Sequence, residues 1–452
     1  GLGDVYKRQS KNIYKNRRDK LGALLPENSV LLLPGADLQY RNADSAFPFR
    51  QESSFYYFSG FCEPSSLVAI VNSDKGLSSI AFVPPKDKIK EIWDGYRAGP
   101  IGAVEDYMFD KAFDNTQIDL MLPDILHGNE QVLYSIGKKK GFDQKVIEWT
   151  TAASSKDRHS KSINITDASS LIGNIRLIKD DHEIDLIKRA CDISAEAHIE
   201  AMKQVKDGDN EQFIESLYIH EFSKRGARFP AYPPIVAGGE NACVLHYVEN
   251  NCDLKKNDLL LVDAGCEFDM YAADITRTFP VGGKFSEEQL KIYKIVLKAM
   301  NAAIDTVKEG NSIMMPQEVS EKVITEGLVE IGILDGDPEQ LHKDGAYKEF
   351  YMHKIGHWLG LDVHDAGDYM EGNEFMKFKP GMITTIEPGI YISSSSNVED
   401  KWKGIGVRIE DDILVTKDGN ENLTKKVPSD PNEIESLMSV SYTHLTLPTI
   451  RS

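Results

Sequence analysis

The sequence has no long apolar run and few cysteines, and both absences narrow the class of protein. No apolar segment approaches the roughly 18 residues that a membrane-spanning helix needs, so we expect no membrane partner. The five cysteines are an odd number and form no CxxC pair. A disulfide framework or zinc ribbon is therefore not expected, and a reducing cytoplasm is the predicted location.

Positive charge is also scarce. The chain has 52 Lys and Arg residues against 71 Asp and Glu, which gives a formal net charge of −19. No basic run resembles a nucleic-acid-binding stripe. We expect no nucleic acid as a partner, and part of the acidic excess could serve to bind cations.

The chain also lacks a Pro/Gly linker, a short-period repeat and a low-complexity tract. At 452 residues it is long enough for two or three domains. A change of pattern near residue 179 predicts an N-terminal α/β domain over 11–178 and a second domain over 179–438. Residues 1–9 and 440–452 resemble one sequencing adapter translated from its two strands, so we expect both ends to be non-native.

Hydrophobic periodicity predicts the main elements. The first half is expected to contain one early helix and three short strands, over 17–25, 30–33, 67–71 and 80–83. Asp180 and Glu183 resemble the start of a helix that ends near Gly208. Further helices are expected over 210–225, 287–308 and 317–331. A mixed sheet covered by helices, an α/β (α+β) fold, follows from this order.

The segment 259–280 carries the first candidate site. An apolar run ends in Asp263, and a second half-buried segment carries Asp274. In a hairpin with 268–269 as its loop, the two aspartates lie directly opposite each other, with β-carbons about 4.5–5.5 Å apart. Such carboxylates repel unless cations lie between them, and two divalent ions about 3.5–4 Å apart fit that spacing. For these two residues alone, solvated aspartates are the favoured alternative.

Three further segments concentrate groups that can bind metals. His353, His357 and His364 lie within twelve positions of a chain that has only 11 histidines, beside glycines that permit close backbone approach. Glu387 ends an apolar run that a Pro-Gly turn cuts, although glutamate is a poor strand former. Strand alternation over 404–412 puts an arginine and a glutamate on one face. A core histidine, an exposed strand end and an exposed edge strand are the respective alternatives.

Charge favours one shared site. The carboxylates of Asp263, Asp274, Glu387 and Glu410 carry four negative charges, which two divalent cations balance, and His357 adds a neutral donor. Without ions, this cluster would carry a large repulsion and desolvation cost. Oxygen donors with one imidazole suit Mn²⁺ best, with Co²⁺, Zn²⁺ and Fe²⁺ as alternatives. We therefore predict a centre of two divalent metal ions.

The order Asp, Asp, His, Glu, Glu in the contexts VDAGCE, DITRTFPV, GHWLGLDVHD, TIEPG and RIEDD resembles the pita-bread metallopeptidases, family M24. Within them the match is to the Xaa-Pro aminopeptidases (aminopeptidase P), and RNADSAFPFRQESSFYYFSGFCEP and EIWDGYR match as well. The resemblance covers about residues 15 to 438. It implies a creatinase/prolidase-like N-terminal domain, a pita-bread catalytic domain, and removal of the residue that precedes a proline at the second position of a peptide.

In that family the two metals share a bridging water or hydroxide. Carried over, the resemblance implies that Asp263 binds one metal, that His357 and Glu387 bind the other, and that Asp274 and Glu410 bridge them. Glu387 would also act as the general base that passes a proton towards the proline nitrogen.

The resemblance assigns further residues to the substrate. His246 and His364 match histidines that orient the substrate carbonyl and stabilise the tetrahedral intermediate. His353 and Tyr391 match residues of the substrate pocket. Arg408 matches an arginine that contacts the site carboxylates and the far end of the substrate.

Two residues of the N-terminal half complete the implied site. Asp44 would hold the free amino group of the substrate, and Trp93 would reach the site of a neighbouring subunit in a homotetramer, with a dimer as the alternative. Lys354 departs from some relatives, which have glycine between the paired histidines, and this puts the shape of the local loop in doubt.

Three alternative functions fit the same family. A prolidase would share all five ligands and cleave X-Pro dipeptides. A non-catalytic pita-bread binding module is expected to lack ligands and to carry basic tails, and a metal-free creatinase-like hydrolase is expected to lack ligands. All five ligands are present here and the chain is acidic, which disfavours the last two.

Overall fold

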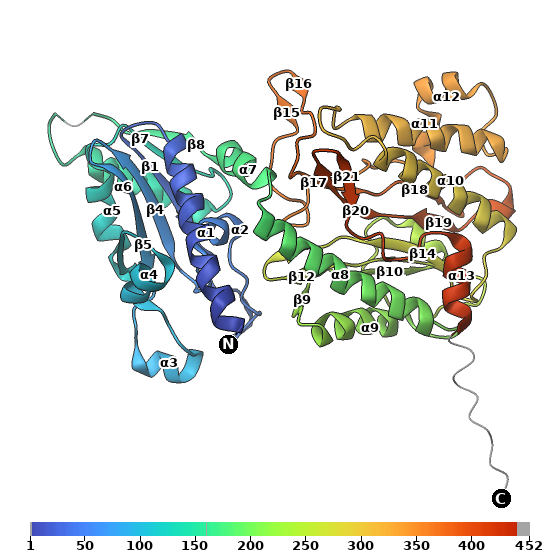
Figure 1. Ribbon diagram of the computed structural model, residues 1–452, viewed down its shortest axis with the longest axis horizontal. Coiled ribbons are helices and arrows are strands. Elements are labelled where there is room, and N and C mark those ends of the chain that lie inside the picture. The colour runs from blue at the N-terminus through green and yellow to red at the C-terminus, as the bar shows by residue number, and fades with distance from the viewer. Residues whose placement is uncertain (1, 160, 441–452) are drawn as a thin grey trace, which may run out of the picture. The chain divides into compact units, whose positions relative to one another are not determined.

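The computed structural model describes residues 2–159 and 161–440, and the chain divides into the units Gly1–Arg176 and Leu177–Ser452 (Figure 1). Most of the C-terminal segment predicted to be non-native therefore lies outside the described residues. No helix within the described ranges combines the length and the apolar character that crossing a membrane requires.

A six-stranded mixed sheet forms the centre of the N-terminal unit. Its strand order is β6 (Lys111–Asp114), β5 (Gly76–Val83), β4 (Leu67–Ser73), β1 (Ser29–Pro34), β7 (Gln131–Tyr134) and β8 (Asn164–Asp167). Strand β4 is antiparallel to both its neighbours, and the other pairs are parallel. The three strands predicted over 30–33, 67–71 and 80–83 are confirmed as β1, β4 and β5.

Helices cover both faces of this sheet. The helices of this unit are α1 (Leu2–Leu24), α2 (Ser53–Ser59), α3 (Lys88–Asp94), α4 (Gly99–Tyr107), α5 (Ile118–Leu126), α6 (Lys140–Ser154) and α7 (Ser169–Leu177). Helix α3 buries no residue and projects away from the sheet (Figure 1). Val30 and Leu32 of β1 share a core with Leu122 of α5 and Val146 of α6. Leu31, on the opposite face, is buried as well. A strand buried on both faces needs an apolar run without alternation, which explains the composition of β1.

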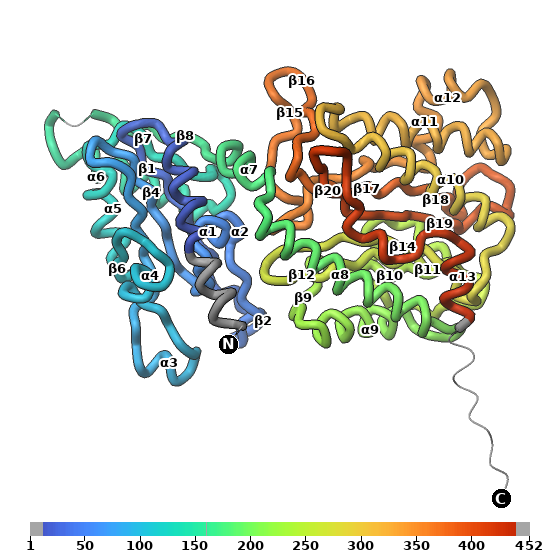
Figure 2. Tube along the Cα trace, in the orientation of Figure 1, coloured from blue at the N-terminus to red at the C-terminus, as the bar shows by residue number. Residues whose placement is uncertain are grey.

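The C-terminal unit is built from short antiparallel sheets (Figure 1). Two three-stranded sheets join β10 (Ile235–Gly238), β11 (Leu259–Asp263) and β14 (Thr276–Pro280), and β13 (Tyr271–Ala272), β12 (Cys266–Phe268) and β9 (Phe229–Pro230). The others join β17 (Ile383–Ile386), β20 (Asp411–Thr416) and β21 (Gly419–Asn422), then β18 (Gly389–Ile392) and β19 (Ile405–Arg408), and β15 (Met370–Glu371) and β16 (Glu374–Phe375). Figure 2 shows how β19, late in the chain, lies beside β11 and β14.

Helix pairs enclose these strands. They are α8 (Asp181–Gln204) and α9 (Glu211–Lys224) on one side and α10 (Glu287–Ile304) and α11 (Met315–Glu330) on the other, followed by α12 (Pro338–Asp344) and α13 (Pro431–Val440) (Figure 1). The predicted start of α8 is confirmed. The backbone N–H of Glu183 donates to the Asp180 side chain over 3.0 Å, and the Asp180 N–H donates to Glu183 over the same distance. Two otherwise unpaired N–H groups are thereby satisfied.

The strands that carry the first two aspartates pair differently from the predicted hairpin. Asp263 of β11 lies opposite Thr276 of β14, and Asp274 lies outside this ladder. The prediction that Asp263 and Asp274 lie directly opposite each other across a 268–269 loop is therefore wrong.

The position of the turn explains the difference. The left-handed φ angles that a two-residue hairpin turn needs occur at Asp269 (47°) and Met270 (75°), one position later than predicted. Moving a turn by one residue shifts every cross-strand partner by two. The backbone at Gly265 lies very close to the backbone at Ala273, and a β-carbon at position 265 would lie 1.7 Å from the carbonyl oxygen of Ala273. Only glycine fits there.

Candidate metal centre

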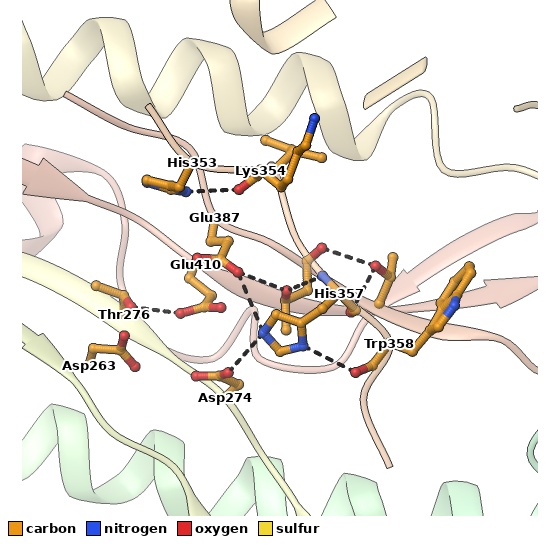
Figure 3. A network of polar contacts seen from close by, with 12 residues as sticks. Asp263, Asp274, Thr276, His353, Lys354, His357, Trp358, Glu387 and Glu410 are labelled. Carbon is orange, nitrogen blue, oxygen red and sulfur yellow. Dashed lines mark hydrogen bonds and ion pairs between the residues drawn. The ribbon is translucent and has the colours of Figure 1, made fainter. Parts of the chain in front are cut away.

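Five segments of the C-terminal unit bring the predicted metal ligands together. Figure 3 shows the carboxyl groups and one imidazole converging on a common space. The ligands lie at the end of β11 (Asp263), before β14 (Asp274), after η3 (Ala346–Glu349) in the loop that contains His357, after β17 (Glu387) and between β19 and β20 (Glu410). The donor atoms of Asp274, His357 and Glu410 lie within 4.8 Å of one another. The structure thus places the donor atoms of three of the five predicted ligands close enough to hold one cation.

Tyr232 joins the two aspartates in place of direct pairing. Its hydroxyl lies 2.6 Å from Oδ1 of Asp263 and 2.5 Å from Oδ1 of Asp274. One hydroxyl carries one proton, so it can serve only one of the two carboxylates at a time. The repulsion between the aspartates is therefore only partly relieved.

Arg408 balances the charge of Asp263. Its Nη2 lies 2.7 Å from Oδ2 of Asp263, and both side chains are largely buried. Burial acts to raise the pKa of Asp263, but Arg408 and Tyr232 outweigh it and hold this pKa below the ordinary value. Asp263 is therefore ionised.

His357 points one ring nitrogen at the acids. Its Nδ1 lies 3.1 Å from the carbonyl oxygen of Trp358, a contact that requires the Nδ1 proton. Its Nε2 lies 3.6 Å from Asp274 and 3.5 Å from Glu387 (Figure 3). Burial acts to lower the pKa of His357, but these two carboxylates raise it to about 9. Nε2 is thus the ring nitrogen of His357 that faces the acids.

The other carboxylates are short of positive charge. Burial, followed by repulsion from neighbouring acids, raises the pKa of Asp274 and raises that of Glu410 strongly. Burial raises the pKa of Glu387 to about 7, against the attraction of His357. Within the described residues, Arg408 forms an ion pair with Asp263, and His357 forms ion pairs with Asp274 and Glu387. The donor set therefore fits divalent cations, which would remove this deficit.

Two threonines orient the glutamates. Thr276 donates to Glu410 over 2.6 Å, and Thr385 donates to Glu387 over 3.3 Å. The N–H of His357 also donates to the Thr385 hydroxyl. Sequence reasoning missed both threonines, although each lies two positions from a predicted ligand. Strand alternation could have found them, whereas no spacing pointed to Tyr232.

A cavity of about 560 Å³ opens beside the acids. Its polar lining includes Asp263, Glu387, Arg408 and four of the predicted histidines, His246, His353, His357 and His364. Its apolar lining includes Ile313, Met314, Pro316, Phe375 and Phe378. Sequence reasoning missed the apolar lining, because its residues resemble ordinary core positions.

Three of the predicted substrate-binding residues form one hydrogen-bonded chain. Arg408 Nη1 donates to the Tyr391 hydroxyl over 3.1 Å, and this hydroxyl lies 2.8 Å from Nε2 of His353. Burial lowers the pKa of His353 to about 4, so its ring is neutral. His364 is exposed, and its ring centroid lies 4.0 Å from that of His357.

Asp44 and Trp93 belong to the N-terminal unit. Asp44 is exposed in the hairpin between β2 (Tyr40–Asn42) and β3 (Ser45–Ala46). Trp93, in α3, is 84% exposed. Their predicted roles at the site stay predictions.

The fold and the buried acid cluster are those of a metallopeptidase. The sequence model of metallopeptidase family M24 matches residues 185–417, and that of the aminopeptidase P N-terminal domain matches 14–134. The chain belongs to metallopeptidase family M24. The predicted fold class and enzyme class are thereby confirmed.

The relatives narrow this class. The chain is 43% identical to the Xaa-Pro aminopeptidase of Haemophilus influenzae, over 95% of its own length and 97% of the relative. Aminopeptidase PepP of Pseudomonas aeruginosa superposes with a TM-score of 0.93 at 44% identity, covering 96% and 98% of the two chains. Zn-substituted Escherichia coli aminopeptidase P in complex with product superposes with a TM-score of 0.92 at 39% identity, covering 95% and 98%. The resemblance to Xaa-Pro aminopeptidases seen in the sequence is confirmed.

Proposed function

We propose that the protein is a two-metal Xaa-Pro aminopeptidase that releases the first residue of peptides with proline in second position. The observation that carries the proposal is the cluster of buried acids whose raised pKa values call for cations, set in the wall of a peptide-sized cavity. The similarity to Xaa-Pro aminopeptidases over nearly the whole chain supports it. Proline-containing peptides are the proposed substrates.

Asp263, Asp274, His357, Glu387 and Glu410 would hold two divalent ions. Mn²⁺ is the proposed ion because the donors are mostly oxygen, with Co²⁺, Zn²⁺ and Fe²⁺ as alternatives. Two bound cations would balance the four carboxylates and lower the pKa of a water molecule towards neutrality. Glu387 would pass a proton from that water towards the leaving proline nitrogen.

The cavity walls would select the substrate. An X-Pro bond has no N–H, so the site must recognise the ring by shape rather than by backbone pairing. His246 and His364 would orient the scissile carbonyl and stabilise the developing negative charge. The chain from Arg408 through Tyr391 to His353 would hold the part of the peptide beyond the bond.

Four further features belong to the proposal. Asp44 would bind the free amino group, and Trp93 would complete the site of a second subunit in a homotetramer or dimer. The domain division at 11–178 and 179–438 is supported by the unit boundary after Arg176. A cytoplasmic location is supported by the five free cysteines.

The decisive experiment combines metal removal with a peptide series. The protein is chelated and reloaded with Mn²⁺, Co²⁺, Zn²⁺ or Fe²⁺ in turn, and each form is offered an X-Pro dipeptide, an X-Pro-Y tripeptide and an X-Ala-Y control. We expect metal-dependent release of X from the X-Pro-Y peptide, with little cleavage of the control. Cleavage of the dipeptide alone would identify a prolidase. A folded protein that neither binds metal nor cleaves any peptide would be a binding module.

A further inference from the structure

Glu211, the first residue of α9, is completely buried outside the metal centre. Within the described residues it forms no ion pair with lysine, arginine or histidine. A buried carboxylate without a cation is costly unless hydrogen-bond donors surround it. The hydrogen-bond donors around Glu211 therefore explain how its side chain is accommodated in the interior.

Four donors surround the Glu211 carboxylate. Oε1 accepts from the backbone N–H of Gly238 over 2.8 Å and from the Asn241 side chain over 2.9 Å. Oε2 accepts from the Tyr247 hydroxyl over 2.8 Å and from the backbone N–H of Cys252 over 2.9 Å. A carboxylate accepts about four hydrogen bonds, so this shell is complete.

These donors belong to one loop and its two ends. The 239–252 loop follows β10 and begins with η2 (Gly239–Cys243), and its middle carries Leu245 and His246 into the wall of the cavity. Gly238 precedes the loop, Cys252 closes it, and Tyr247 is the neighbour of His246. Glu211 therefore ties both ends and the middle of this loop to one buried point.

His246 depends on that loop for its position. Its exposed imidazole forms no hydrogen bond with any of the residues that the structure describes, whereas His353 and His357 are each held by ring hydrogen bonds. The backbone of the 239–252 loop is therefore what places the His246 ring. Catalytic groups lose effect when they shift by about 1 Å.

We propose that Glu211 is a positioning residue that acts on the reaction through His246, an inference that rests on the proposed role of His246 towards the substrate carbonyl. Glutamine is the sharpest replacement, because it keeps the size of glutamate. One of its two polar ends is an NH₂ group, which must then face a backbone N–H or another donor. E211Q therefore breaks the shell without emptying the space.

The kinetic test is a double-mutant cycle on an X-Pro-Y peptide with the metal-loaded enzyme. We expect E211Q to lower kcat about 10- to 100-fold with little change in KM and in bound metal. In the H246A background, E211Q should lower kcat by less than about twofold, because the group it positions is gone. Equal effects of E211Q in both backgrounds would overturn the proposal.

Two further variants control the test. E221Q alters another buried glutamate of α9, whose carboxylate pairs with Lys224 and Arg225 instead of donors of the 239–252 loop, so kcat should stay unchanged. Y247F removes one of the four donors and is the milder probe if E211Q does not fold. Y247F should also lower kcat, and only in the protein that retains His246.

Hydrogen exchange gives a readout that is independent of activity. We expect backbone amides of the 239–252 loop to exchange about tenfold faster in E211Q than in E221Q, because local opening becomes easier. Unchanged exchange in E211Q would show that Glu211 does not hold the loop. If the wild-type protein cleaves no X-Pro peptide, the proposed function fails, while the exchange comparison still tests the positioning role.

Discussion

Glu410 and Asp411 are neighbours in the sequence, and both are buried, but their surroundings differ. Oδ1 of Asp411 lies 2.7 Å from Nη2 of Arg277. The Asp411 carboxylate also accepts hydrogen bonds from the side chains of Thr424 and Asn422, each over 2.7 Å. Among the described residues, Thr276 is the side-chain donor to Glu410, and burial, followed by repulsion from nearby acids, raises the pKa of Glu410 strongly. Burial alone therefore does not mark a metal ligand. The two residues differ in how far protein donors satisfy their carboxylates.

The same contrast extends through the C-terminal unit. The Arg277–Asp411 pair and the Glu211 shell are satisfied by protein groups and need no ligand. Burial, with repulsion from neighbouring acids, raises the pKa values of Asp274 and Glu387, as it does that of Glu410. We call the first set the structural region and the second the metal region.

The largest expected effect separates the two regions directly. E410Q should lower kcat/KM on the order of 10³-fold or more, because a bound metal supplies several kcal/mol of transition-state stabilisation. D411N should instead cost about 3–5 kcal/mol of unfolding free energy, because it removes the charged partner of the buried Arg277. Urea unfolding, bound metal and kinetics measure both. If D411N lost bound metal while its unfolding free energy stayed unchanged, the distinction between the structural region and the metal region would be wrong.

Metal removal should affect only the metal region. Chelation should lower the unfolding free energy, and Mn²⁺ at 100 times its Kd should restore about 2.7 kcal/mol. Calorimetry across a Mn²⁺ series checks this. E410Q serves as the control, because weaker binding should move its response to higher Mn²⁺ concentration. An unfolding temperature that does not change with Mn²⁺ concentration would contradict a cation site.

The unfolding free energy of the chelated protein should depend on pH through the titration of Glu387. Its pKa in the folded protein is about 7, above its ordinary value of 4.5, because the site is buried. The folded state therefore holds this proton more tightly. Its stabilising contribution is complete below pH 4.5 and is lost as the pH rises through 7. Unfolding measured over this range for wild type and E387Q isolates the effect, since the glutamine cannot titrate.

The smallest effect near neutral pH concerns His198, which, like the structural region, is satisfied by protein groups. Its Nε2 lies 2.9 Å from the carbonyl oxygen of Ala264, and its Nδ1 lies 2.9 Å from the Tyr218 hydroxyl. Burial lowers its pKa to about 3, so its contribution to stability is present above pH 6.5 and is lost as the pH falls towards 3. H198Q should flatten this acid-side loss in unfolding experiments. An identical slope in both proteins would exclude His198 as its cause.

Much of the candidate site could be predicted from local pattern. Asp263, Glu387 and the Asp180 helix start lie at the ends of regular elements, where apolar periodicity stops and a polar group follows. Such boundaries depend on residues a few positions apart, so a linear sequence contains them. The contacts of Tyr232 join residues 31 and 42 positions away, and no local pattern encodes them.

The register shows the limit most clearly. A shift of the turn by one residue decides whether Asp263 lies opposite Asp274 or opposite Thr276. The left-handed backbone at Asp269 and Met270 sets the position of the turn. The predicted and the observed strand registers satisfy the same apolar pattern, because they differ by two residues and leave each side chain on the same face of the sheet. Periodicity could not choose between them.

The sequence by itself determined the inventory of this protein: a strand-and-helix order, an excess of acid, and donors of the kind that bind hard divalent cations. Only the tertiary structure decided which buried acids are satisfied by the protein and which are left short of charge. The physical reason is that the pKa of a buried carboxylate depends on donors and charges within a few ångströms. Those neighbours come from segments that folding alone brings together.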